Sequence, residues 1–121
     1  MRTQKSRSVS LAVLTLVLAG CAVSIETQPA RESDECNMAR VSGILAVDSQ
    51  VGVGLADGNG VVRRVIWPFG YSARREQAGV VLIDDTGRIV AREGQRIETA
   101  GGIGGADDVI YPCGGPVRIV E

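Results

Sequence analysis

From Ala39 onward, turn-forming residues divide the chain into short β-branched runs, and this pattern limits the available folds more than any other feature. Asp57-Gly58-Asn59-Gly60 and Asp84-Asp85-Thr86-Gly87 predict two hairpin turns, because Asn and Gly accept a positive φ at little cost. The β-branched runs between such turns predict strands at 40–47, 50–56, 61–67, 80–83, 88–92, 95–99 and 116–120. The sequence therefore indicates an all-β domain.

The segment Ser72–Ala78 (SARREQA) is the one stretch with helical composition, and it allows barely two turns, with Ser72 as an N-cap. Three strands, then a short helix or loop, then two or three further strands is an order that resembles the OB-fold. We predict a small OB-like barrel or roll of five to seven short strands with one short helix or loop, occupying residues 38–121. A small β-sandwich is the alternative.

The first 20 residues are organised like an export signal. Arg2, Lys5 and Arg7 precede an apolar run at 9–19. As a helix this run would rise about 16 Å, roughly half of a ~30 Å hydrocarbon core, which suits a cleaved signal peptide better than a permanent span.

The apolar run ends in Leu18-Ala19-Gly20-Cys21, which resembles the lipobox of bacterial lipoproteins. The resemblance implies a signal peptide at 1–20, lipid on the Cys21 thiol, and a cell-membrane location on the extracytoplasmic side. Two or more acyl chains on one cysteine make a stable membrane anchor. Residues 22–35 are polar and acidic, so we expect 21–37 to be the lipidated end and a flexible tether. A secreted protein with an incidental cysteine, or a buried helix of a cytosolic fold, are the alternatives.

Lipidation of Cys21 would leave an even pair of cysteines, Cys36 and Cys113. In an oxidising compartment such a pair predicts a disulfide, and closing so long a loop would stabilise the fold by about 4 to 5 kcal/mol. The competing interpretation is a metal or catalytic thiol pair. Because the chain has no His and no CxxC spacing, we predict neither a metal site nor a cofactor.

The charge balance bears on the class of partner. Of the 13 cationic residues three precede the apolar run, so the remaining ten face all 14 acidic residues, a net charge of minus four. Nucleic-acid binding depends on clustered positive charge. We therefore predict no nucleic-acid partner.

Three of the four aromatic residues, Trp67, Phe69 and Tyr71, lie within five positions of one another and just before Arg74 and Arg75. Aromatic faces beside guanidinium groups bind rings, sugars or anionic groups. If the domain has a ligand-binding face, we expect it to contain Trp67, Tyr71, Arg74 and Arg75. The alternative is that the aromatic residues close one end of a barrel while the arginines are solvated.

Other patterns carry less chemistry. The segment 101–108 (GGIGGADD) lacks the Lys-Ser/Thr of a phosphate loop, and we expect a flexible loop. The acid pairs Asp84/Asp85 and Asp107/Asp108 suggest two-carboxylate hydrolysis, but adjacent side chains usually point apart, so turn chemistry is favoured. Without His, and without Lys after Lys5, a Ser or Cys nucleophile lacks its usual base, so we predict no catalytic residues and no enzyme activity.

The stretch 65–93 contains WPFGYSARRE and GVVLIDDTGRIVARE. It resembles small uncharacterised lipoproteins of actinobacteria that combine a lipobox, a WP-x-GY-x-AR stretch and a late cysteine, here Trp67, Pro68, Gly70, Tyr71, Ala73, Arg74 and Cys113. The resemblance implies a compartment but no activity. We predict a lipid-anchored binding module at the cell surface or in the envelope, with a protein, a glycan or a small ligand as partner. An envelope hydrolase using acidic residues and a purely structural envelope protein are the alternatives.

Overall fold

The computed structural model describes residues 21–30, 39–105, 108–113 and 115–121 of the chain. Within these ranges the protein contains strands and turns and no helix, so the predicted all-β class is confirmed. The predicted signal peptide at 1–20 lies outside the described residues. No helix in the described part of the chain is long and apolar enough to cross a membrane.

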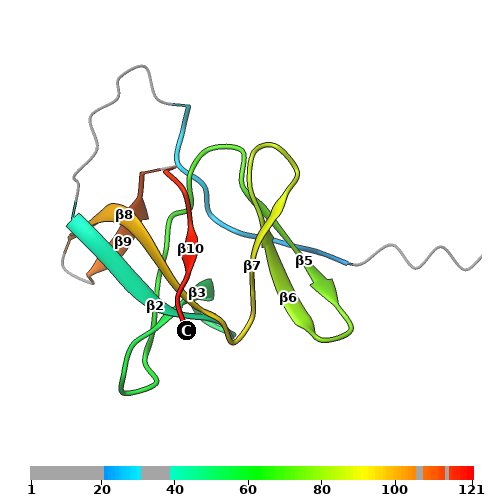
Figure 1. Ribbon diagram of the computed structural model, residues 1–121, viewed down its shortest axis with the longest axis horizontal. Coiled ribbons are helices and arrows are strands. Elements are labelled where there is room, and N and C mark those ends of the chain that lie inside the picture. Colours follow the sequence, from blue (N-terminus) through cyan, green and yellow to red (C-terminus); the bar gives the residue numbers. More distant parts are fainter. Residues whose placement is uncertain (1–20, 31–38, 106–107, 114) are drawn as a thin grey trace, which may run out of the picture.

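The larger of two sheets is a six-stranded antiparallel sheet that curves into a nearly closed barrel (Figure 1). Its strands run in the order β10-β8-β2-β3-β4, and β9 pairs with the last four residues of β8, Gly101–Gly104. A parallel bridge between Val65 and Ile110 joins the chain after β4 to β9 and closes the ring. The strands are β2 (Ala39–Asp48), β3 (Gly52–Ala56), β4 (Val62–Arg63), β8 (Arg96–Gly104), β9 (Val109–Pro112) and β10 (Arg118–Ile119).

The second sheet has four antiparallel strands in the order β1-β5-β6-β7 and lies beside the barrel (Figure 1). They are β1 (Ala22–Val23), β5 (Ser72–Glu76), β6 (Gly79–Ile83) and β7 (Ile89–Arg92). One hydrophobic core joins both sheets, because Leu45 and Leu55 of the barrel belong to the same buried cluster as Val80 and Leu82 of β6. The two sheets therefore form one folded unit.

Side-chain hydrogen bonds of an aspartate stabilise each of the two predicted turns. The Asp57 carboxylate accepts hydrogen bonds from the backbone N–H groups of Asn59 at 2.8 Å and Val61 at 3.1 Å. Asp84 does the same for Thr86 and Arg88 and also accepts the Thr86 hydroxyl. These local bonds position the β3–β4 and β6–β7 hairpins.

Three segments differ from the sequence predictions. Ser72–Ala78 is β5 followed by a turn, because β5 pairs with β6 on one side and with β1 on the other. The glycine-rich stretch belongs to β8 as far as Gly104 and pairs with β9. Residues 61–67 form a two-residue strand and isolated bridges where a full strand was expected.

A fourth difference concerns the expected tether. Residues 21–28 pack along the domain: β1 pairs with β5, and Thr27 forms a bridge with Trp67. The buried Gln28 donates through Nε2 to the carbonyl oxygens of Ile66 at 2.8 Å and Pro112 at 2.7 Å. This first part of the segment is therefore a structural element of the domain.

Candidate functional site

The barrel opens where β2 separates from β3. The second half of β2 pairs with β3, from Ile44 to Asp48, whereas the first half, from Ala39 to Ile44, pairs with β8. In the described part of the chain no strand pairs with Ala39–Gly43 on the side facing β3. Gly43 lies at the point of separation, where an added Cβ would come within 2.9 Å of the Leu55 Cβ and 3.0 Å of the Ala56 carbonyl oxygen.

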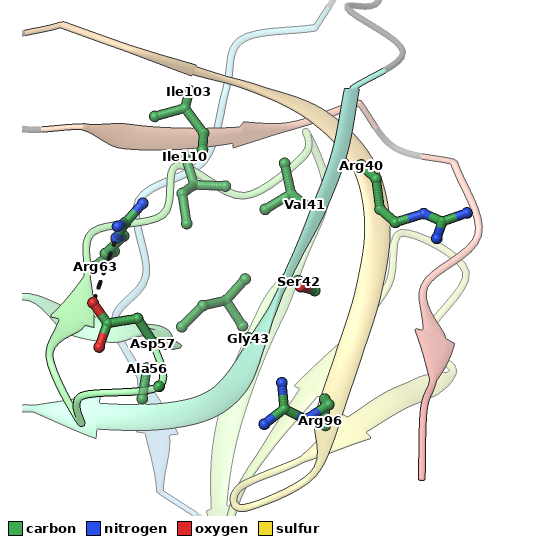
Figure 2. A pocket seen from close by; sticks show the side chains of 12 residues that line it. Arg40, Val41, Ser42, Gly43, Ala56, Asp57, Arg63, Arg96, Ile103 and Ile110 are labelled. Atoms are coloured by element: carbon green, nitrogen blue, oxygen red, sulfur yellow. Dashed lines mark ion pairs between the residues drawn. The ribbon is translucent and has the colours of Figure 1, made fainter.

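A cavity of about 310 Å³ occupies this opening, and we call it the seam cavity. Its floor is apolar and consists of the interior side chains Val41, Leu55 and Ile110. Figure 2 shows Val41 and Ile110 between β2 and the β3–β4 hairpin, with Arg63 and Asp57 on the hairpin side. Ile103 of β8, which is 52% exposed, also lines the opening. The cavity thus joins barrel interior to solvent.

Guanidinium groups give the rim of the seam cavity a positive excess. Arg63 faces Asp57, with 4.0 Å between Nε and Oδ2. The exposed Arg96 side chain has no hydrogen bond or ion pair within the described ranges, and it reaches the cavity from β8. Arg40 also touches the cavity, but it pairs with Glu98 at 3.1 Å and points away from the opening (Figure 2). The rim therefore carries two guanidinium groups, Arg63 and Arg96, and one carboxylate, Asp57, which favours an anionic group at the rim.

The lining of the seam cavity suits binding better than proton transfer. Asp57 is its single carboxylate, and no Cys or Lys lines it. Two hydrogen bonds from its own turn already occupy Asp57 Oδ1. Buried apolar side chains beside a few polar groups can hold a ligand that has an apolar part and an anionic part.

The residues predicted as a ligand-binding face do not share one surface. Trp67 is 0% exposed, and its indole Nε1 donates to the Val53 carbonyl oxygen at 3.0 Å. Tyr71 is also buried, whereas Phe69 is 60% exposed. Trp67 and Tyr71 therefore belong to the buried core, as the alternative interpretation requires of them, whereas Phe69 does not.

Arg74 and Arg75 lie on β5 in the second sheet and are exposed. Arg74 pairs with Glu76 at 3.5 Å, and Arg75 donates its backbone N–H to the Cys21 carbonyl oxygen at 2.9 Å. The two arginines therefore lie beside the N-terminal segment and away from the buried indole of Trp67.

The acid pair Asp84/Asp85 lines a second cavity, of about 520 Å³, together with Tyr71. The Thr86 hydroxyl, which donates to Asp84, together with two backbone N–H groups, holds the pKa of that carboxyl below its usual value. Burial raises the pKa of Tyr71, and the charges of Asp84 and Asp85 raise it further. Asp84 is therefore an ionised turn residue at neutral pH and no proton donor. Of the other pair, Asp107 lies outside the described residues, and Asp108 is exposed at a φ of 50°.

Two of the three cysteines lie in the described residues, and the lipidation of Cys21 stays a prediction. Cys21 is free and exposed. Cys113 is disulfide-bonded, and its expected partner Cys36 lies outside the described residues, so that pairing stays a prediction. No group of three or more His, Cys, Asp or Glu residues in the described ranges is placed to hold a metal ion.

Sequence reasoning missed Arg63 and Arg96, which lie more than 30 positions apart. Each reads as an ordinary polar residue on a strand, and only the separation of β2 from β3 brings both to one opening. Comparison with protein-family models, curated proteins and solved structures finds no match to this chain.

Proposed function

We propose that this protein is a lipid-anchored lipoprotein of the bacterial cell envelope, and that its β domain binds a ligand in the seam cavity. The ligand would carry a carboxylate, phosphate or sulfate group next to an apolar group. The observation that carries this proposal is the set of buried apolar side chains Val41, Leu55 and Ile110 beneath a rim that carries two guanidinium groups, Arg63 and Arg96, and a single carboxylate. A small molecule or the end of a protein or glycan chain would meet this description.

The positions of anchor and cavity support the same function. Cys21 directly precedes β1, at the outer side of β5, whereas the seam cavity lies among β2, β3, β8 and β9. In Figure 1 the start of the described chain lies beside β5 on one side of the domain, and β2 and β9 lie on the other side. A lipid on Cys21 would therefore hold the membrane at one end and leave the cavity open at the other.

The anchor is tested by the intact mass of the protein purified from its native membrane. We expect residues 21–121 plus diacylglyceryl and acyl groups, and an increase of two protons on reduction. A full-length chain, or a chain cleaved elsewhere without lipid, would refute the lipoprotein assignment.

The cavity is tested by titrating the detergent-solubilised lipoprotein with anilinonaphthalene sulfonate, an anionic probe with an apolar ring system. Each charge-assisted hydrogen bond contributes about 1.5 to 3 kcal/mol, so Arg96→Gln or Arg63→Gln should weaken binding roughly tenfold or more. Arg118→Gln is the matched control, since Arg118 is exposed on β10 and does not line the cavity. Thermal unfolding of each variant checks that folding is intact. Equal affinities for all three variants would refute the seam cavity as the binding site.

A further inference from the structure

The N-terminal segment fixes the position of the anchoring residue. Between residues 21 and 28 the chain is held by β1, by the bridge of Thr27 with Trp67, and by the two hydrogen bonds of the Gln28 amide. Arg64 adds an ion pair with Glu26, with Nε 2.9 Å from Oε2. No flexible spacer therefore separates Cys21 from the folded domain, and a lipid on its thiol would bring the outer side of the four-stranded sheet to the membrane surface.

The register of β1 against β5 decides which side chains surround this position. Ala22 pairs with Arg74, so Cys21 stands opposite Arg75, and the Arg75 N–H donates to the Cys21 carbonyl oxygen. Side chains directly opposite on an antiparallel pair lie on the same face, with Cβ atoms about 5 Å apart. The Arg75 guanidinium is therefore the cross-strand neighbour of the lipid-bearing thiol.

The β1–β5 edge carries arginines on both of its faces: Arg75 lies on the face of Cys21, and Arg74 and Arg92 lie on the opposite face. Glu76 is shared by Arg74 at 3.5 Å and Arg92 at 3.7 Å, so one carboxylate serves two guanidinium groups. The exposed Arg75 side chain has no ion pair or hydrogen bond in the described part of the chain. Exposed guanidinium groups on both faces of this edge match the charge of phosphate headgroups.

We propose that the β1–β5 edge is a membrane-contact surface, on which Arg75, beside Cys21, and Arg74, on the opposite face of β5, bind anionic lipid headgroups and orient the domain. This inference rests on the lipidation of Cys21 given under Proposed function. An arginine near an anionic membrane contributes about a fivefold preference for the bound state, so two would contribute roughly 30-fold. On neutral lipid the anchor alone holds the protein, and the domain samples many orientations.

The experiment uses the native lipoprotein reconstituted into two kinds of vesicle, one of phosphatidylcholine alone and one containing phosphatidylglycerol. Hydrogen exchange is followed by mass spectrometry for the peptide covering residues 72–79. In the anionic vesicles we expect exchange of this peptide to slow by up to about 30-fold, and high salt should reverse the effect because it screens exposed charges.

Variants separate charge from structure. Arg74→Gln with Arg75→Gln should abolish the difference between the two vesicles, whereas Arg74→Lys with Arg75→Lys should keep most of it, and Arg96→Gln should leave it unchanged. Equal exchange on both lipids, or a difference that survives the double Gln variant, would overturn the inference while leaving the anchor in place. Failure of the protein to float with neutral vesicles would remove the anchor itself, and this inference with it.

Discussion

Replacing Gln28 with Ala tests whether the N-terminal segment is part of the folded unit. The Gln28 Nε2 donates to the carbonyl oxygens of Ile66 and Pro112, which come from two different parts of the barrel. A buried acceptor that loses its donor costs about 1 to 3 kcal/mol. The Ile66 bond is only partly buried, so water can replace part of it, and we expect Gln28→Ala to lower the free energy of unfolding by about 3 kcal/mol.

Urea denaturation of the oxidised protein measures this loss. With an m-value of about 1.5 kcal/mol/M for a domain of this size, the midpoint should fall by about 2 M while m stays unchanged. Gln28→Glu is the informative second variant, because it keeps the shape of the side chain but cannot donate when ionised. Gln50→Ala, in an exposed turn, is the matched control and should shift the midpoint very little. If Gln28→Ala matched this control, residues 21–30 would be a tether after all and the reasoning would fail.

Three further predictions follow from single groups. Thr99 Oγ1 is buried and has no hydrogen-bond partner in the described structure, so Thr99→Val should raise the free energy of unfolding by about 1 kcal/mol; a loss of stability on urea titration would show that the hydroxyl has a partner. Because folding raises the pKa of Tyr71, the folded state retains a proton that the unfolded state loses near pH 10, so stability should fall as pH rises above about 10 and through the folded pKa. Unfolding measured between about pH 9 and 11 should show less of this fall in Tyr71→Phe, and an identical slope would contradict the assignment. Peptide mapping without reductant should join Cys36 to Cys113, and reduction should cost about 4 to 5 kcal/mol of stability; any other pairing of Cys113 would refute the loop closure.

The hairpins were predictable because their information is local. The carboxylates of Asp57 and Asp84 each accept hydrogen bonds from the backbone N–H groups two and four positions later. Five consecutive residues therefore determine each turn. The strands on either side then follow from alternation and length. For this reason β2, β3, β6 and β7 were expected close to where they occur.

Segments whose partners are distant in sequence were predicted less well. SARREQA is a strand because β1 and β6 supply backbone partners on both its sides, and a two-turn helix has little intrinsic stability to oppose them. Gly101 allows β8 and β9 to approach closely, because a Cβ added at this position would come within 2.7 Å of the Tyr111 carbonyl oxygen. A glycine-rich segment in a single sequence does not show whether its glycines allow two strands to approach closely or make a loop flexible.

The candidate site shows the same division. The exposed arginines of β5 could be singled out from their position beside aromatic residues, but the burial of Trp67 depends on packing of both sheets. The seam cavity depends on the exact residue, Ile44, at which β2 changes partners, and no pattern along the chain marks that position. The sequence therefore contains Arg63 and Arg96 but does not indicate that they line the same cavity.

The two-residue strand β1 has a role beyond positioning Cys21, because it covers the outer side of β5. A strand at the edge of a sheet with unpaired N–H and C=O groups is a template for pairing with another chain. A proteolytic cut after Val23 would remove this cover together with Cys21 and the lipid that we propose for it. We expect such a shed fragment to self-associate through β5, in contrast to the domain that keeps residues 21–23, and a monomeric fragment in sedimentation would contradict this. Release from the membrane and loss of solubility would then be the same event.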